Sequence, residues 1–358
     1  MIHAILASLV LAAAPAATLH AASPADRAAL LAAQKARVTE MAKAPKASPH
    51  LAFVSNGVAD FWTIAKAGAL AAGRDLKCQV TVEFPGAGLS DQKRMLEDLV
   101  TRGIDGVSVS PIDPKNQREV LDLIAERSLL ITNDSDAPEA PRLAYIGMDN
   151  YLAGRKCGEL ARAGLPGGGE VAIFIGRLEQ DNAKRRWQGF VDGLLGRSVD
   201  ATRRDDHTKP FTEAGYTILG TWTDSFDRAK AKANVEDVMT RNPGLDLVTG
   251  LFEYNSVLAL EVFKQAGKAG TIKIAGFDEG AEVIEGIREG SVLGTVVQDP
   301  YGYGYQSIVL LHALTQGKLE ALPASGEIAI PARTITKENV DAFWSDLKAK
   351  LAAGKAVK

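Results

Sequence analysis

Apolar runs of strand length alternate with stretches of helical spacing through most of the chain. The first such runs lie at residues 51–54, 78–84, 104–109 and 129–132. Between them, as at 95–100 and 120–125, apolar residues recur at the spacing of an amphipathic helix. Strands that alternate with helices predict a parallel sheet covered by helices.

A second series of the same kind begins after the YIGMDN segment at residues 145–150. Its strand-like runs lie at 171–175, 216–222, 245–249, 272–277 and 292–297, with helical stretches at 152–163, 185–195, 227–241 and 257–266. Two series predict an α/β fold of two doubly wound parallel-sheet lobes with a cleft between them. We expect a hinge of three segments near 147–150, 298–300 and 326–330.

The expected division of the chain begins with a signal peptide at 1–22 and a helical or loosely ordered spacer at 23–48. The first lobe is expected at 49–148 with 300–326, the second at 149–299 with 327–335, and a C-terminal helix at 336–358. The polar stretch 195–213 is expected as an exposed loop.

Residues 2–22 are rich in alanine and contain no Lys, Arg, Asp or Glu. The apolar core has the length of a signal-peptide h-region, and small residues suited to cleavage follow it. Pro15 and these small residues argue against a membrane anchor. The sequence therefore predicts an exported protein whose signal peptide is removed, with cleavage near Ala16 or Ala22 left open.

Charge and motifs exclude several classes of function. The net charge of -3, with Lys and Arg spread along the chain, gives no reason to expect nucleic acid as a partner. The five histidines and two cysteines form no metal-ligand spacing, and no phosphate-binding glycine loop is present. We therefore expect no metal and no cofactor. Cys78 and Cys157 are interpreted as small apolar residues, although export leaves a disulfide open.

Polar and aromatic side chains follow the predicted strands at the point where each strand ends. In residues 271–298, Asp278 follows one strand and Gln298 follows the next. Since ligands of parallel α/β sheets bind outside the carboxyl ends of the strands, such residues are expected in the cleft. The other candidates are Asn56, Phe61, Trp62, Asp134, Arg186, Phe226, Glu253 and Asn255. Aromatic faces combined with planar hydrogen-bonding groups suit a sugar.

Each candidate also has a structural explanation when it is taken alone. Asn and Asp after a strand commonly make turns and helix caps. Phe61 or Trp62 is equally consistent with a core position, and Arg186 with a solvated helix face. The functional prediction depends on the coincidence of all of them at strand ends.

Several segments resemble those of type I periplasmic sugar-binding proteins of ABC importers, especially the ribose-binding group. They include FVSNGVADFW, ITNDSD, IAGFDEG and GTVVQDPYGYGYQS, and they keep their order and spacing from about residue 51 to 331. The resemblance implies sugar contacts from Asn56, Phe61, Trp62 and Asp134 in the first lobe. It implies contacts from Arg186, Phe226, Asp278 and Gln298 in the second lobe and hinge.

Two positions depart from the pattern of that group. Ser135 stands where the ribose-binding group has an arginine, and Glu253 stands where it has an asparagine, with Asn255 as the alternative register. The loss of a guanidinium and the gain of a carboxylate change which ligand groups are recognised, so the ligand need not be ribose.

The sequence thus predicts an exported, monomeric, non-catalytic protein that binds a monosaccharide by hinge closure. It would deliver the sugar to the membrane permease of an ABC importer. The alternative is a sensor of the same fold that presents a sugar or another small polar solute to a membrane signalling receptor. An enzyme is not expected, because no nucleophile with an adjacent base, metal cluster or cofactor loop is visible.

Overall fold

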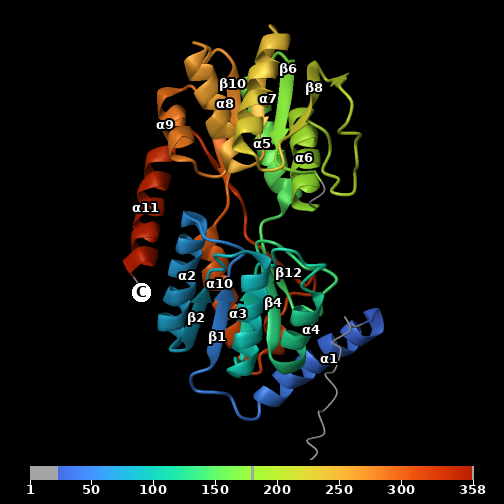
Figure 1. Cartoon of the computed structure of the whole chain (residues 1–358), viewed down its shortest axis with the longest axis vertical. Coiled ribbons are helices and arrows are strands. Elements are labelled where there is room, and N and C mark those ends of the chain that lie inside the picture. Colours follow the sequence, from blue (N-terminus) through green and yellow to red (C-terminus); the bar gives the residue numbers. More distant parts are fainter. Residues whose placement is uncertain (1–22, 179–180, 357–358) are drawn as a thin grey trace, which may run out of the picture.

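The computed structural model of the chain describes residues 23–178 and 181–356 and consists of two α/β lobes, one above the other in Figure 1. The expected signal peptide at 1–22 lies outside the described residues. Among the helices of the described ranges, none is long and apolar enough to cross a membrane. The predicted fold class of two doubly wound parallel-sheet lobes is confirmed.

The first lobe contains a parallel sheet with the strand order β12-β5-β4-β3-β1-β2. Its strands are β1 (His50–Val54), β2 (Gln79–Glu83), β3 (Gly106–Val109), β4 (Leu129–Asn133), β5 (Tyr145–Gly147) and β12 (Glu327–Ala329). Its helices are α1 (Pro24–Met41), α2 (Asp60–Leu76), α3 (Leu89–Thr101), α4 (Arg118–Arg127), α10 (Pro300–Thr315) and the short η1 (Leu319–Ala321). Because helices cover both faces, β3 and β4 are buried along their whole length.

The second lobe contains a sheet with the strand order β13-β11-β10-β9-β6-β8-β7, in which β7 and β13 are antiparallel to their neighbours. Its strands are β6 (Gly169–Ile175), β7 (Phe211–Glu213), β8 (Tyr216–Thr223), β9 (Leu245–Gly250), β10 (Lys273–Phe277), β11 (Gly294–Val297) and β13 (Arg333–Ile335). Its helices are α5 (Asn150–Gly164), α6 (Asp181–Leu194), α7 (Arg228–Arg241), α8 (Glu253–Gln265) and α9 (Ala281–Glu289), and α11 (Val340–Ala356) follows β13.

The chain passes between the lobes at three places. Residues 148–149 join β5 to α5, residues 298–299 join β11 to α10, and residues 330–332 join β12 to β13. The first two crossings lie within the predicted hinge segments 147–150 and 298–300. The third lies later in the chain than the predicted segment 326–330. We expected 327–335 in the second lobe, but β12 pairs with β5 in the first sheet, Ile328 opposite Ile146. This pairing satisfies the backbone groups along the edge of β5, which would otherwise lack partners.

The segment at 23–48, expected as a spacer, is largely an ordered helix of the first lobe. Gln34 in α1 is fully buried; its amide donates to Pro141 O at 2.6 Å and accepts from Leu130 N at 2.8 Å. Arg37 donates to Ser128 O at 2.6 Å. These contacts attach α1 to the loops that flank β4, far from the other lobe (Figure 1).

Helix α11 leaves the second lobe and runs beside the hinge to the first lobe (Figure 1). Phe343 and Leu347 pack in the same apolar cluster as Ile64 of α2. Near its end, Gly354 lies so close to α2 that a Cβ there would be 2.1 Å from Thr63 O. The expected C-terminal helix is therefore present, and it connects both lobes outside the three crossings.

The stretch 195–213, expected as an exposed loop, is attached to the second lobe by strand pairing, ion pairs and hydrogen bonds. It ends in β7, which pairs with β8. Arg197 and Arg203 both reach the fully buried carboxylate of Asp192, at 3.3 and 2.7 Å. Cys78 precedes β2 in the first lobe and Cys157 lies in α5 of the second, and both are free thiols.

Candidate functional site

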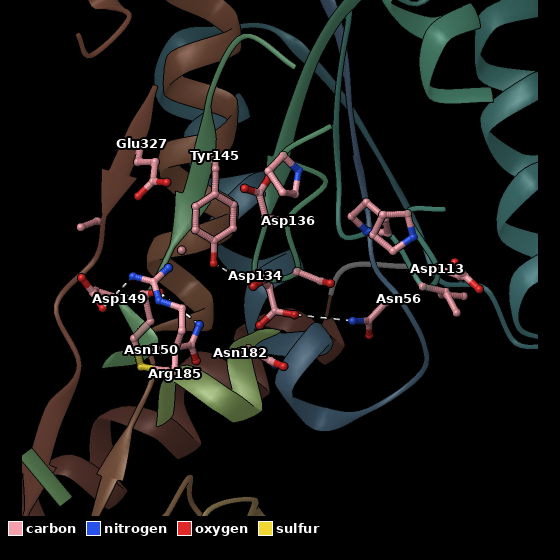
Figure 2. A pocket seen from close by; sticks show the side chains of 18 residues that line it. Asn56, Asp113, Asp134, Asp136, Tyr145, Asp149, Asn150, Asn182, Arg185 and Glu327 are labelled. Carbon is pink, nitrogen blue, oxygen red and sulfur yellow. Dashed lines mark hydrogen bonds and ion pairs between the residues drawn. The ribbon is translucent and has the colours of Figure 1, made fainter. Parts of the chain in front are cut away.

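A cavity of about 590 Å³ lies between the lobes and is lined from both sides. The first lobe contributes residues that follow β1, β3 and β4, and the second contributes the first turns of α5 and α6 (Figure 2). The polar lining residues include Asn56, Asp113, Asp134, Asn150, Asn182 and Arg185. A cavity of this size is typical of small-molecule sites.

Asp134 is the first residue after β4 and has left-handed backbone, with φ 55°. Its Oδ2 accepts from Ser110 Oγ at 3.2 Å and from Asn56 Nδ2 at 3.5 Å. Its carbonyl accepts from the Tyr145 hydroxyl at 2.8 Å. Burial raises the pKa of Asp134 to about 6, against the opposing effect of the nearby Arg186 charge. The Asp134 carboxylate is thus held by residues that follow β1 and β3 of its own lobe. Its pKa is also lowered by the Arg186 charge of the second lobe.

Asp278 is the matching residue after β10, with φ 60°. Gln298, in the second hinge crossing, donates from Nε2 to Asp278 Oδ1 at 3.0 Å. The Tyr303 hydroxyl of α10 in turn donates to Gln298 Oε1 at 3.1 Å. Burial raises the pKa of Asp278, and Arg186 lowers it. A chain of hydrogen bonds therefore runs from the second lobe through the hinge to the first lobe.

Arg186 lies at the centre of the second-lobe wall and is only 4% exposed. Its Nε donates to Asn150 Oδ1 at 2.7 Å and its Nη1 to Leu251 O at 3.2 Å. Its guanidinium lies 4.6 Å from the centre of the Phe277 ring, a cation–π distance. The backbone of α6 reaches this depth because Gly154 of α5 has no side chain: a Cβ there would be 2.1 Å from Arg186 O.

Several polar and aromatic side chains lie together just after the ends of β8 and β9. Asn255 is 1% exposed and donates from Nδ2 to Asp224 Oδ2 at 2.9 Å, and the Tyr254 hydroxyl donates to Asp224 Oδ1 at 2.5 Å. Phe226 is 44% exposed and its ring centre lies 5.7 Å from that of Phe252. Glu253 begins α8 beside them.

The ten predicted residues are distributed over both lobes and the hinge, and two of them line the cavity directly. Asn56 and Asp134 line the cavity, while Arg186 and Asp278 are near enough to influence the pKa of Asp134. Phe61 contacts both lobes, with its ring centre 6.2 Å from that of Tyr303. Trp62 is placed in the first-lobe core instead, 4% exposed, because the next position of α2 turns toward Phe53 of β1.

Several residues at the site were not among the candidates. Ser110 follows β3 directly and could have been found by the strand-end rule that identified Asp134. Asn150 and Tyr303 had no such signal, since each lies in the first turn of a helix that starts just after a hinge crossing. Glu279 follows Asp278, and its Oε2 is buried without a hydrogen-bond partner among the described residues.

The groups at the cleft are hydrogen-bonding carboxylates, amides and a guanidinium, together with aromatic rings. Within residues 23–178 and 181–356, no group of three or more His, Cys, Asp and Glu side chains is arranged to hold a metal ion. Such a set of side chains can bind a small polar solute through several directed hydrogen bonds.

Proteins of known function have sequences similar to this chain. The D-ribose/D-allose-binding protein of Pseudomonas aeruginosa is 23% identical over 254 residues, which cover 69% of this chain and 74% of that protein. The D-allose-binding periplasmic protein of Escherichia coli is 22% identical over 283 residues, covering 75% of this chain and 86% of that protein.

Solved structures share the fold. An ABC-transporter solute-binding protein from Burkholderia graminis, in complex with D-arabinose, has a TM-score of 0.70 at 25% identity, covering 82% of this chain and 97% of that one. The arabinose-binding protein of Geobacillus stearothermophilus has a TM-score of 0.71 at 20% identity, covering 83% and 99%. Residues 51–319 match the family model of the periplasmic binding protein domain. The chain therefore belongs to the periplasmic binding protein family.

Proposed function

We propose that this protein is an exported receptor that captures a monosaccharide between its lobes and delivers it to the membrane permease of an ABC importer. The observation that carries the proposal is the pair of strand-end aspartates, Asp134 and Asp278, which belong to opposite lobes and lie near enough for the Asp278 charge to raise the pKa of Asp134. Each retains a carboxylate oxygen with no hydrogen-bond donor among the described residues. Bidentate pairing of carboxylates with neighbouring hydroxyls is a way to recognise a sugar.

Aromatic rings at the two walls supply the apolar part of the contact. Phe61 is half-buried at the start of α2, and Phe226 is exposed on the opposite lobe. The C–H faces of a sugar ring pack on such rings while its hydroxyls reach the polar groups. The combination favours a compact polyol over a purely apolar ligand.

Hinge closure would enclose the sugar. The three crossings at 148–149, 298–299 and 330–332 are short, and rotation about a few such residues closes two-lobed binding proteins. The hydrogen bonds from Asp278 through Gln298 to Tyr303 pass through one of these crossings. A ligand bound to Asp134 and Asp278 together would favour the closed arrangement, which is the form a permease would recognise.

The relatives support transport over other roles. Their names state ribose, allose and arabinose as ligands, and one solved relative is named as a transporter component. A non-catalytic, monomeric receptor outside the cytoplasmic membrane is consistent with this. The particular sugar is to be found by experiment.

Thermal unfolding of residues 23–358 against a panel of pentoses, hexoses, cyclitols and nucleosides tests the proposal. A ligand that binds only the folded state adds about 2.7 kcal/mol of stability at a hundredfold excess over its Kd. We expect a clear rise in Tm with one or a few sugars or cyclitols. A rise with nucleosides alone would refute the sugar assignment, and no rise with any compound would refute the proposed capture of a monosaccharide.

A further inference from the structure

Carboxylates gather at one edge of the second-lobe sheet. Strands β9 and β10 are parallel, with Thr249 opposite Ala275, so Glu253 and Asp278 leave the sheet at the same edge. The Glu253 carboxylate lies against the segment that follows Asp278, because a Cβ on Gly280 would be 2.7 Å from Glu253 Oε1. The third carboxylate, Glu279, lies between Asp278 and Gly280 in the chain. The edge therefore holds three acidic groups within a short distance.

In the described ranges no salt bridge joins an arginine or lysine to Glu253, Asp278 or Glu279. Burial, and then the Asp278 charge, raises the pKa of Glu253, and burial followed by Asp278 raises the pKa of Glu279 to about 8. Uncompensated carboxylates in a partly buried edge are costly unless a positive group joins them.

The arginines nearest to this edge have other contacts. Arg186 donates to Asn150 and to Leu251 O. The Arg228 guanidinium lies 5.9 Å from the centre of the Tyr254 ring. A third, Arg333, lies over the ring of Phe343 of α11 at 5.3 Å. They reduce the local negative potential, but their donors are not directed at the three carboxylates.

Hydrogen-bond donors at the cleft are largely used within the protein, whereas acceptors are left over. Gln298 Nε2 donates to Asp278, and Asn255 Nδ2 donates to Asp224. Asn255 Oδ1 and Glu279 Oε2 are buried and have no partner among the described residues. A hydroxyl brings one donor and two acceptor lone pairs, while an ammonium group brings three donors and no acceptor. The acceptors without a partner therefore match an ammonium group, which only donates, better than they match a hydroxyl.

We propose that the ligand captured in this cleft is a monosaccharide or cyclitol that carries a protonated amine. The ammonium group would lie between Glu253 and Asp278 and would favour the charged forms of both carboxylates. The remaining hydroxyls would bind Asp134 and Asn56 across the cleft. The proposal rests on the sugar-capture function above and names the chemical class of its ligand.

Isothermal titration of the full mature chain with matched sets tests this. Each set contains a neutral sugar, its 2-amino form and the N-acetylated amine: D-glucose, D-galactose and D-mannose with their derivatives, and myo-inositol with an aminocyclitol. We expect at least one amine to bind about tenfold or more tightly than both its neutral parent and its N-acetyl form, since a charge-assisted hydrogen bond is roughly twice as strong as a neutral one. Raising the salt concentration should reduce that difference.

Glu253→Gln is the informative variant, because it keeps the size of the side chain and removes the charge. It should lose about tenfold of the amine's affinity while the neutral parent changes by less than about threefold. Glu261→Gln is the matched control: it removes a charge from the same helix α8, at an exposed position paired with Lys232, and should leave both affinities unchanged.

The outcomes separate the inference from the proposed function. Neutral sugars that bind as tightly as their amines, or a Glu253→Gln variant with the wild-type preference, would overturn the inference and leave sugar capture standing. Stabilisation by calcium chloride alone, without any effect of the amines, would also overturn it by assigning the carboxylates to a metal ion. No binding by any compound in the sets would overturn both.

Discussion

Asp134 and Asp278 are the first residues after buried parallel strands of opposite lobes, and both have left-handed backbone, with φ 55° and 60°. Few residues other than glycine adopt this conformation at low cost; Asp and Asn are the main ones, because their short polar side chains bond locally. Such backbone in a non-glycine residue commonly occurs at functional sites. Each lobe thus contributes one strand-end carboxylate, and the Asp278 charge is near enough to raise the pKa of Asp134.

Replacing Asp278 with Asn should abolish tight sugar binding while leaving the empty protein folded. Asn tolerates the left-handed backbone, and its Oδ1 still accepts from Gln298 Nε2. It loses the charge that strengthens hydrogen bonds from the ligand, so we expect affinity to fall by about tenfold or more. Titration calorimetry measures the affinity and circular dichroism the Tm. Unchanged affinity for the sugar that binds the wild type would contradict the proposed site.

Asp134 should make the stability of the empty protein depend on pH in an unusual direction. Its folded pKa, about 6, is above the ordinary value of 3.8, so the folded state holds the proton more tightly than the unfolded state. Stability from this group is therefore present at low pH and is lost as the pH rises through about 6.

Asp134→Asn removes that titration. We expect the empty variant to be more stable than wild type at pH above 7 by about 1 to 3 kcal/mol, with little difference below pH about 3.5, and to bind sugar poorly. Urea unfolding at several pH values measures the difference. An Asn variant that is equally or less stable at neutral pH would show that the folded protein does not destabilise the charged form.

Gly154→Ala should disturb the site from outside the cleft. The new Cβ would be 2.1 Å from Arg186 O, so α5 and α6 must move apart and Arg186 must shift from Asn150 and Leu251 O. We expect a loss of about 1 to 3 kcal/mol in unfolding free energy together with weaker sugar binding. Gly167→Ala is the control, because no heavy atom lies within 4 Å of its added Cβ. Wild-type stability and affinity in Gly154→Ala would mean that the helix contact is not as close as described.

Gly354→Ala should weaken the contact between α11 and the first lobe. Its Cβ would be 2.1 Å from Thr63 O of α2, so the last turns of α11 must separate from that helix. We expect faster amide hydrogen exchange in 350–356 and a stability loss of about 1 kcal/mol or more, with the sugar site itself intact. Hydrogen exchange by mass spectrometry would locate the change. Unaltered exchange in this segment would argue against close packing of α11 on α2.

Trp62 and Phe61 show where sequence reasoning reached its limit. Both follow β1 and begin an amphipathic helix, so the pattern made both of them cleft candidates and left open which one belongs to the core. The rotation of α2 about its axis turns Trp62 toward Phe53 in the core and leaves Phe61 at the boundary of the two lobes. That rotation depends on how α2 packs against α10 and α11, which are distant in the chain.

The positions of Asp134, Asp278 and Gln298 directly after strands could be predicted from the sequence because they depend on local geometry. A buried parallel strand reads as a continuous apolar run, and the residue after it must leave the sheet at the carboxyl edge, where ligands bind. The alternation of strands and helices likewise predicts the two lobes and the first two hinge crossings without knowledge of any distant contact.

Tertiary structure alone decided which chain segments complete each lobe and how the site residues are held. Pairing of β12 with β5, the return of α11 to α2, and the bonds of Arg186 to Asn150 and of Gln298 to Tyr303 join parts of the fold whose meeting depends on packing. The strand and helix periods determine which side chains leave the sheet at its ligand edge. Packing of distant helices and strands determines which of those side chains meet, because no local period encodes contacts made across the fold.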